Sequence, residues 1–319
     1  MQRYIVRRLL VTIPILFGIT VINFLVMNAA PGDPVSNALI VGAPGQSIGD
    51  PEAQRELLGL NRPLPVRYVL WLKELLQGNM GESLVTRRPV LTMIGERVGP
   101  TVQLSALALF LSFAIAVPVG IISAVKQYSW LDYAVTVATF ISASIPGFFF
   151  AILAIYIFAL ALGWLPISGT QTIGQPWSLG DYLWHMILPA SVLALPGSAS
   201  LARYARSQML DTIRQDYLAT ARAKGLRRAY ILARHALPNA ILPLITLAAL
   251  DVPTLFSGAV IAETIFRWPG MGQLGVSSAF ARDYTVLMGL GVISATLIVF
   301  SNLVADILYA ALDPRIRYD

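Results

Sequence analysis

The feature that most constrains this sequence is a set of long runs that contain almost no charge. The clearest run extends from Leu9 to Ala30 and follows a short basic opening at Arg3, Arg7 and Arg8. A helix of about 20 apolar residues is long enough to cross the roughly 30 Å hydrocarbon core of a bilayer. Charged residues make up only 13% of the chain, against roughly 25% in a typical soluble domain. We therefore expect an integral membrane protein.

The first apolar run is longer than the apolar region of a cleaved signal peptide, so we expect an uncleaved first span within residues 1–30. Residues 31–99 mix both charge signs with Gly and Pro and predict an ordered external loop, including a helix over 66–76. Residues 100–319 predict a five-helix core. The expected fold is all-α, with about six transmembrane helices at 9–30, 101–125, 133–162, 185–202, 241–262 and 284–312.

The distribution of Lys and Arg sets the orientation of these spans. With both termini inside, the inner segments hold fourteen cations and the outer segments hold nine, although the first outer loop is far longer than either inner end. Cations favour the cytoplasmic side of a membrane protein. Both termini are therefore expected in the cytoplasm. The same pattern explains the net positive charge of the chain, so a nucleic-acid partner is not needed to account for it.

Residues 203–238 form a basic segment between two apolar runs, and its middle has helix start and stop signals. Asp216 is expected to cap an Ala-rich helix that ends at Lys224, and Gly225 is expected to provide the left-handed residue after it. A second helix over 226–236 is expected to stop at Pro238. The cations of the segment are Arg203, Arg206, Arg214, Arg222, Lys224, Arg227, Arg228 and Arg234.

Two interpretations of the basic segment follow from the residues alone. Its small side chains at Ala219, Ala221 and Ala223 would let the first helix approach a partner closely, as a helix does in a groove. The alternative is a solvated basic loop held against anionic lipid headgroups. The charge pattern does not separate them.

The spacing of Ala219-Thr220-Ala221, Gly225 and His235-Ala236-Leu237-Pro238 resembles the EAA loop in membrane subunits of bacterial ABC importers. Ala219 stands in place of the family's Glu, and His235 in place of its Ile. The segment 216–226 is similar to the form found in the dipeptide and oligopeptide (peptide/nickel) permease branch. Residues 58–83, 263–272 and 313–317 also resemble that branch, in the subunit type with a long first external loop.

The resemblance implies a type I importer permease fold and a multi-pass protein of the bacterial cytoplasmic membrane. It also implies transport of peptides, or of nickel chelates, glutathione or sugars; a secondary transporter is the rival class. Implied partners are a second permease subunit, two ATP-binding subunits and an extracytoplasmic binding protein. The implied contacts with the ATPase are Asp216, Tyr217, Ala219, Thr220, Ala221, Arg222, Ala223, Lys224, Gly225, Leu226, His235 and Pro238.

No catalytic chemistry is expected in this chain. A nucleotide-binding P-loop needs Gly immediately before its Lys, and Lys73, Lys126 and Lys224 follow Leu, Val and Ala. ATP and Mg²⁺ are therefore expected only in partner subunits. The chain has no cysteine and two histidines on separate segments, so we expect no metal site.

Five residues are candidates for the substrate path. Ser144 and Pro146 interrupt the third span, where freed backbone groups must be buried in protein or face a wet cavity. Asp251 lies deep in the fifth span, and Thr254 and Gly258 extend its helical face. Two roles are possible for the carboxyl group of Asp251. It either forms an interhelical hydrogen bond, or it is an anion that lines the path and meets a peptide's ammonium group; the sequence leaves both open.

Four aromatic or acidic residues in the outer segments are candidates for docking the external binding protein. Tyr68 and Trp71 lie in the first outer loop, and Glu263 and Trp268 in the last. Their assignment follows from the outer segments that resemble the peptide branch.

Overall fold

The computed structural model describes residues 2–29, 61–256 and 259–312. Regular structure in these ranges is helical, apart from an isolated bridge between Glu82 and Pro89. The helices are α1 (Gln2–Ala29), α4 (Leu64–Leu76), α5 (Val90–Val125), α6 (Trp130–Ser144), α7 (Gly147–Ala154), η1 (Ile155–Ala161), α8 (Leu179–Ile213), α9 (Asp216–Ala223), α10 (Arg228–Ile231), η2 (Leu232–Ala236), α11 (Leu237–Leu250), η3 (Val252–Phe256), α12 (Val260–Ile265), α13 (Met271–Phe280) and α14 (Tyr284–Leu312).

The described residues contain five helices long and apolar enough to cross a bilayer. They are Leu10–Ala29, Val90–Val125, Leu179–Ile213, Arg228–Ala248 and Tyr284–Ala305. A bent pair formed by α6 with α7 and η1 makes a sixth if it counts as one span. The predicted all-α membrane fold of about six spans is confirmed.

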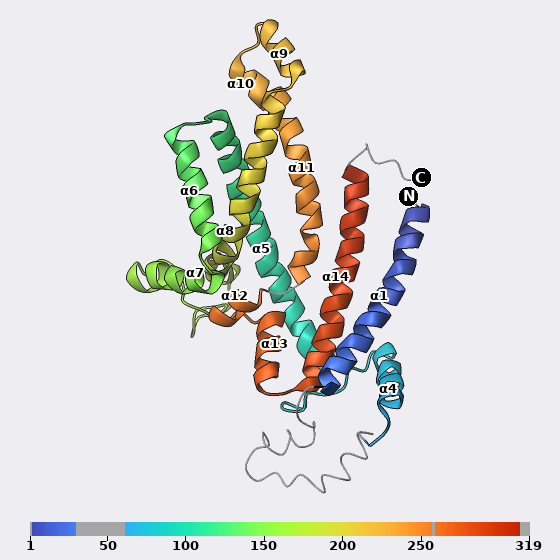
Figure 1. Ribbon diagram of the computed structural model, residues 1–319. Helices are drawn as coiled ribbons and strands as arrows, with labels where there is room; N and C mark the ends of the chain where they lie inside the picture. Colours follow the sequence, from blue (N-terminus) through green and yellow to red (C-terminus); the bar gives the residue numbers. More distant parts are fainter. Residues whose placement is uncertain (1, 30–60, 257–258, 313–319) are drawn as a thin grey trace.

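The bundle has two distinct ends (Figure 1). The start of α1, the end of α14, the turn between α5 and α6, and the short helices α9 and α10 lie at one end, which we call the α9 end. Helices α4 and α13 lie at the opposite end, the α13 end. The start of α1 and the end of α14 therefore lie on the same side of the bundle as α9 and α10, as the expected topology requires.

The long helices α5 and α8 pack against each other through small side chains. At Gly120 of α5, a Cβ atom would lie 2.4 Å from the carbonyl oxygen of Ala202 and 2.7 Å from the Cβ of Ala205, both on α8. Only glycine allows the two backbones to approach this closely. Close packing of small residues is the usual basis of helix association in a membrane, where the hydrophobic effect does not drive helices together.

Helix α5 begins at Val90, eleven residues before the predicted start at Thr101. The predicted boundary between external loop and core, at residues 99 and 100, therefore falls inside a helix. Pro100 lies within α5, and the indole Nε1 of Trp268 donates to its carbonyl at 2.9 Å, which ties this part of the helix to the connection between α12 and α13.

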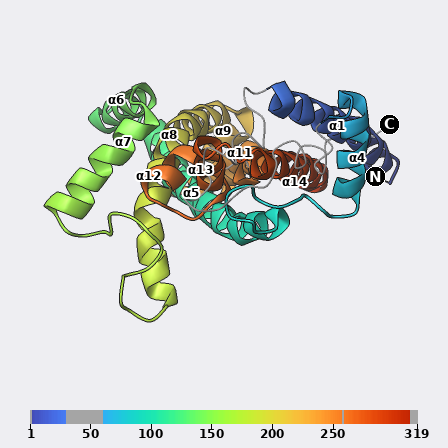
Figure 2. The ribbon, with the colours of Figure 1, turned by 90° about the horizontal axis from the view of Figure 1, so that it is seen from below.

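The predicted third span is not a single straight helix. The axis bends by 107° between α6 and α7, at Ile145 and Pro146. A residue before proline is disfavoured in the helical conformation, and Ile145 has an extended backbone with ψ 126°. Seen from below, α7 projects sideways from the bundle (Figure 2).

The predicted fifth span is also broken. Helix α11 ends at Leu250, the short 3₁₀ helix η3 covers Val252–Phe256, and α12 begins at Val260. Pro253 has no amide hydrogen to continue the α-helical ladder, and the Thr254 amide instead makes a tighter bond to the Asp251 carbonyl at 3.0 Å. Asp251 thus lies at a break between helices. Residues 257 and 258, including the candidate Gly258, fall outside the described residues.

Helix α4 confirms the helix expected over 66–76 and starts two residues earlier. Its two aromatic residues, Tyr68 and Trp71, pack against Phe24 of α1 with ring centroids 5.4 and 5.6 Å away. The Tyr68 hydroxyl also lies 2.9 Å from the hydroxyl of Thr20. The amphipathic helix is therefore fixed to the first span.

Candidate functional site

Helix α9 has a defined start and a defined stop. Its N-cap is Gln215, and Asp216 is the first helical residue without a capping hydrogen bond, so the predicted capping role of Asp216 is wrong. Asp216 still places a negative charge in the first turn, where the helix dipole favours it. The difference arises because Gln215, with ψ 144°, already has the extended backbone that an N-cap requires.

The end of α9 is a Schellman motif. Gly225 has φ +77°, its amide donates to the Arg222 carbonyl at 2.9 Å, and the Leu226 amide donates to the Ala221 carbonyl at 3.4 Å. This pair of hydrogen bonds is the usual C-terminal cap of a helix that is followed by a residue in the left-handed conformation. A Cβ at Gly225 would meet no atom within 4 Å, so backbone conformation, not space, requires glycine here.

The second helix of the basic segment does not stop at Pro238. Helix α10 continues through the π-helical turn η2 into α11, which contains Pro238 in its first turn. The Leu237 amide donates to Leu232, five residues back. Such a wider turn relieves the clash between a proline ring and the preceding turn. The predicted stop is therefore wrong, and the basic segment joins the next span without interruption.

Helix α9 is anchored to the bundle by one deeply buried side chain. Leu218 is 1% exposed and packs in an apolar cluster at the ends of α5, α8 and α11. The other members of the cluster are Ala124, Met209, Ile231, Ala236 and Ala240. Asn239 strengthens the attachment, because its Nδ2 atom donates to the carbonyl of His235 at 2.7 Å and to the hydroxyl of Tyr217 at 3.3 Å.

The remainder of α9 forms an exposed, cationic surface of small residues. Its exposed or partly exposed side chains include Ala219, Thr220, Ala221, Ala223 and Lys224, followed by the exposed Leu226. The exposed cations around the helix are Arg214, Arg222, Lys224, Arg227, Arg228 and Arg234. The predicted ATPase contacts from 216 to 226 therefore form one continuous surface. His235 lies between α9 and α11, because its carbonyl accepts hydrogen bonds from Asn239 of α11 and Tyr217 of α9.

A cavity of about 300 Å³ lies where the fifth span breaks. Asp251 and Thr254 line it from the break, and Ser105 and Ser112 line it from the middle of α5. Gly197 of α8 completes a wall with little side-chain bulk. Within the described residues we find no hydrogen-bond partner for the Asp251 carboxyl group. Polar cavities beside broken helices are where transporters place their binding sites.

The two other path candidates do not reach this cavity. Ser144 and Pro146 lie at the bend between α6 and α7, and the Ser144 hydroxyl donates to the Phe140 carbonyl of its own helix at 2.8 Å. The structure thus brings Asp251 and Thr254 together and separates them from the bend. A charge deep in a membrane costs about 2.5 to 3.5 kcal/mol on insertion scales, so a cavity that includes hydroxyl groups is a more favourable place for Asp251 than the lipid.

Glu263 and Trp268 are enclosed by this chain, and their predicted contact with a binding protein does not fit that burial. Both are 0% exposed. The Glu263 carboxylate accepts the hydroxyl of Thr101 at 2.8 Å and the amide of Gln273 in the first turn of α13 at 3.0 Å. It is therefore a cap for the start of α13 and has no surface for docking. Gly270 is required beside it, because a Cβ would lie 2.2 Å from the carboxyl carbon of Glu263.

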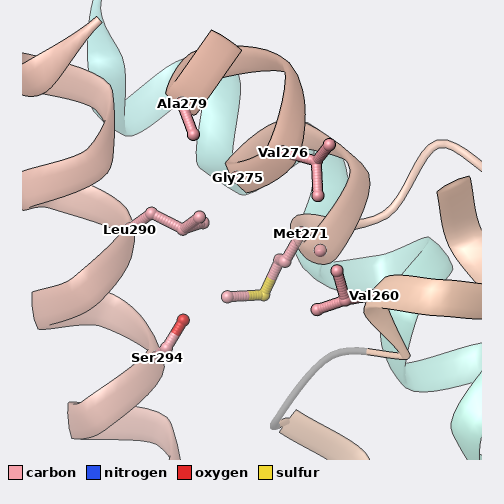
Figure 3. A pocket seen from close by; sticks show the side chains of 8 residues that line it. Val260, Met271, Gly275, Val276, Ala279, Leu290 and Ser294 are labelled. Carbon is pink, nitrogen blue, oxygen red and sulfur yellow. The ribbon is translucent and has the colours of Figure 1, made fainter. Parts of the chain in front are cut away.

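A smaller apolar cavity of about 270 Å³ lies at the α13 end, between α12, α13 and α14. The Met271 side chain points toward α14, where Leu290 and Ser294 face it, and Val260 borders the cavity from α12 (Figure 3). Gly275 leaves room on the α13 side. The sequence had indicated no cavity here, because its lining residues are ordinary components of an apolar bundle.

Sequence reasoning also missed an ion pair near the α9 end. Asp132, at the start of α6, is 3% exposed and accepts from Nε and Nη2 of Arg206 at 2.7 and 2.8 Å. The same carboxylate accepts from the Tyr128 amide at 3.0 Å and from the hydroxyl of Ser123. Arg206 lies near the end of α8 and was predicted only as one of the cations of the basic segment.

Comparison with known families agrees with this architecture. A family model described as the inner membrane component of binding-protein-dependent transport systems matches residues 116–318, and the model of the N-terminal part of such components matches residues 1–105. This chain belongs to that family. The family predicted from the sequence is therefore confirmed, and the α9 surface lies inside the matched core of the transport-system component.

Full-length relatives share substantial identity with this family member. It is 46% identical over 319 residues to the oligopeptide transport system permease protein AppB of Bacillus subtilis, covering 100% of both chains. It is 37% identical over 336 residues to the dipeptide transport system permease protein DppB of Alkalihalophilus pseudofirmus, again covering 100% of both. A chain of the inward-facing MetNI methionine ABC transporter shares the fold with a TM-score of 0.55 and 19% identity, covering 70% of this chain and 97% of that one.

Proposed function

We propose that this chain is the membrane-spanning permease subunit of an ATP-driven peptide importer, and that ATP is hydrolysed by partner subunits docked on α9. The observation that carries the proposal is α9 itself, a short helix with a fixed start and stop that exposes small residues and cations beyond the bundle. Such a helix suits insertion into a groove on a partner. The absence of a P-loop in the sequence supports a separate source of ATP hydrolysis.

The proposed orientation places the α9 end in the cytoplasm of a bacterial cell. The cation surplus of the segments at this end supports that orientation. Two ATP-binding subunits would then bind inside, and a substrate-binding protein would deliver its ligand to the α13 end. A homologous second permease subunit would complete the path, since the family's transport systems need a route across the membrane and the polar cavity here is small.

Peptides are the proposed substrate class, and the names of the relatives support this choice. AppB and DppB are named for oligopeptide and dipeptide transport, and each matches the whole of this chain. Asp251 would contribute an anion to the path in a cavity that also contains hydroxyl groups. A peptide carries an ammonium group at its amino terminus, so a carboxylate in this position would favour it by simple charge attraction.

In the proposed mechanism, closure of the ATPase dimer displaces α9 and changes which side of the membrane the cavity faces. The ATP-bound ATPase must bind one of the two arrangements more tightly than the other, because a ligand shifts an equilibrium only by its differential affinity. The anchoring of Leu218 among the ends of α5, α8 and α11 supports this route, since a displacement of α9 would act directly on three helices.

Reconstitution tests the proposal. The complex of this chain with the second permease subunit, the ATP-binding subunits and the binding protein of the same transport system is placed in lipid vesicles, and uptake of a labelled dipeptide and a labelled pentapeptide is measured with ATP. We expect ATP-dependent uptake of at least one peptide. Assembly of an active ATPase that accumulates neither peptide would contradict the peptide assignment, and failure of this chain to associate with ATP-binding subunits would contradict the permease assignment.

A further inference from the structure

The ion pair between Asp132 and Arg206 lies at a junction of three elements. Ser123 belongs to the end of α5, Tyr128 to the turn after it, Asp132 to the first turn of α6, and Arg206 to α8. Each carboxylate oxygen accepts two hydrogen bonds: Oδ1 from Ser123 and Arg206, and Oδ2 from Tyr128 and Arg206. The two-pronged geometry of arginine against a carboxylate fixes orientation as well as distance. This junction therefore holds α5, α6 and α8 in one relative position.

The junction also lies close to the base of α9. Helix α8 continues from Arg206 to Ile213, and α9 begins at Asp216. Between them, Met209 of α8 and Ala124 of α5 pack in the same apolar cluster as Leu218 of α9. A displacement of α9 is thus transferred to the end of α8 through packed side chains, and the ion pair is the next polar contact along α8.

Other contacts between α6 and α8 are weaker. The Ser142 hydroxyl donates to the Leu195 carbonyl at 3.4 Å, and the Arg203 guanidinium lies 5.7 Å from the centre of the Phe140 ring. Neither contact has the paired hydrogen bonds of Asp132 and Arg206. The contrast with α5 is clear, because α5 and α8 touch through their backbones at Gly120. The ion pair is therefore the strongest polar contact described between α6 and α8.

We propose that Asp132 and Arg206 are positioning residues for transport, which make α6 and the bent arm α7 move together with α8 when the ATPase displaces α9. The inference rests on the proposed function, because it assumes that α9 receives the movement. Loss of the pair would leave α9 free to move with its partner while α6 and α7 lag behind. ATP hydrolysis would then continue without a full change in the path.

The experiment uses the complete complex in lipid vesicles and measures peptide uptake and ATP hydrolysis together. Asp132→Asn removes the charge and keeps the side-chain size. The double variant Asp132→Asn with Arg206→Gln also removes the partly buried cation that the single variant leaves unpaired and that could otherwise impair folding. The matched control is Arg88→Gln with Glu96→Gln, which removes an exposed ion pair of 2.5 Å that lies outside the α9 end.

We expect both test variants to assemble and hydrolyse ATP while uptake per ATP falls several-fold, and the control pair to leave that ratio unchanged. A double variant that assembles and transports with the unchanged ratio would overturn the proposal. Failure of both test variants to assemble would overturn it too, since the pair would then serve folding alone.

A second measurement separates this proposal from the proposed function. The chain has no native cysteine, so spin labels at Tyr133→Cys on α6 and Ser207→Cys on α8 report the distance between the two helices. We expect this distance to stay constant between the nucleotide-free and ATP-bound complex, and to change on ATP binding in the double variant. An unchanged distance in the double variant contradicts the proposal. Absence of peptide uptake by the unaltered complex would instead count against the proposed function, and the spin-label distances would still decide the role of the pair.

Discussion

At the α13 end two carboxylates are buried and satisfied within the chain, whereas the charged side chains of α9 itself face outward. Glu263 and Asp283 are 0% and 3% exposed, and each carboxylate accepts hydrogen bonds from one hydroxyl and from at least one backbone amide. Helix α9 instead buries only Leu218 and leaves its cations in solvent. A closed polar network stabilises its own chain, while an exposed one is available to another molecule. The difference assigns a structural role to the first region and a binding role to the second.

The largest effect on stability is expected from Glu263→Ala at the α13 end. The change leaves the Gln273 amide and the Thr101 hydroxyl without their acceptor and opens a cavity, which together should cost about 3 to 5 kcal/mol of unfolding free energy. Thermal unfolding of the purified chain in detergent measures it. Glu96→Ala is the control, because its exposed ion pair should contribute less than about 1 kcal/mol. Equal losses for the two variants would contradict the distinction between closed and open networks.

A smaller loss of stability but a strong loss of coupling is expected from Gly225→Val. A β-branched residue at φ +77° should cost about 1 to 3 kcal/mol locally and displace the end of α9. Gly225→Asn is the matched control, since Asn tolerates the left-handed conformation and no atom lies within 4 Å of an added Cβ. We expect the Val variant to insert in the membrane yet lose co-purification with the ATP-binding subunits. If the Val variant co-purified fully with the ATP-binding subunits, the proposed coupling role of α9 would be wrong.

The smallest effect is expected from Asp251→Asn, which preserves the shape and polarity of the side chain but removes the charge. Folding and association with the ATPase should be unaffected, because the residue lies at the cavity far from α9. We expect weaker uptake of peptides with a free amino terminus and little change for peptides whose amino terminus is acetylated. If the two peptide types respond alike, the carboxylate does not recognise the ammonium group and Asp251 is a packing residue.

Local signals in the sequence predicted the exposed region better than the buried one. The Ala-rich run and Gly225 located α9 because helix stops depend on neighbouring residues. The spans followed from length and hydrophobicity, and the interruption of the third span at Ser144 and Pro146 was predicted. The break at Pro253 was not, because a proline in a membrane helix can also be accommodated without a break, as Pro100 and Pro238 show. Whether it breaks the helix depends on partners elsewhere in the fold.

The buried polar contacts could not be predicted for a related reason. Thr101 and Glu263 are 162 positions apart, and Asp132 and Arg206 are 74 apart. Sequence patterns of one helix do not indicate which distant residue completes such a pair. The assignment of Glu263 and Trp268 to docking does not fit their burial for this reason. A predicted outer location suggested exposure, but the interior network of the α13 end was not visible in the sequence.

The most direct test of the account is the reactivity of a single cysteine on α9. Ala219→Cys in the cysteine-free chain is treated with an impermeant maleimide, in intact cells and in inside-out vesicles with and without the ATP-binding subunits. Gln175→Cys, exposed in the connection before α8, is the control for the opposite face. The account predicts that position 219 reacts only from the cytoplasmic side and is protected when the ATPase binds, while position 175 reacts from outside. Labelling of position 219 from outside, or equal labelling with and without the ATPase, would contradict it.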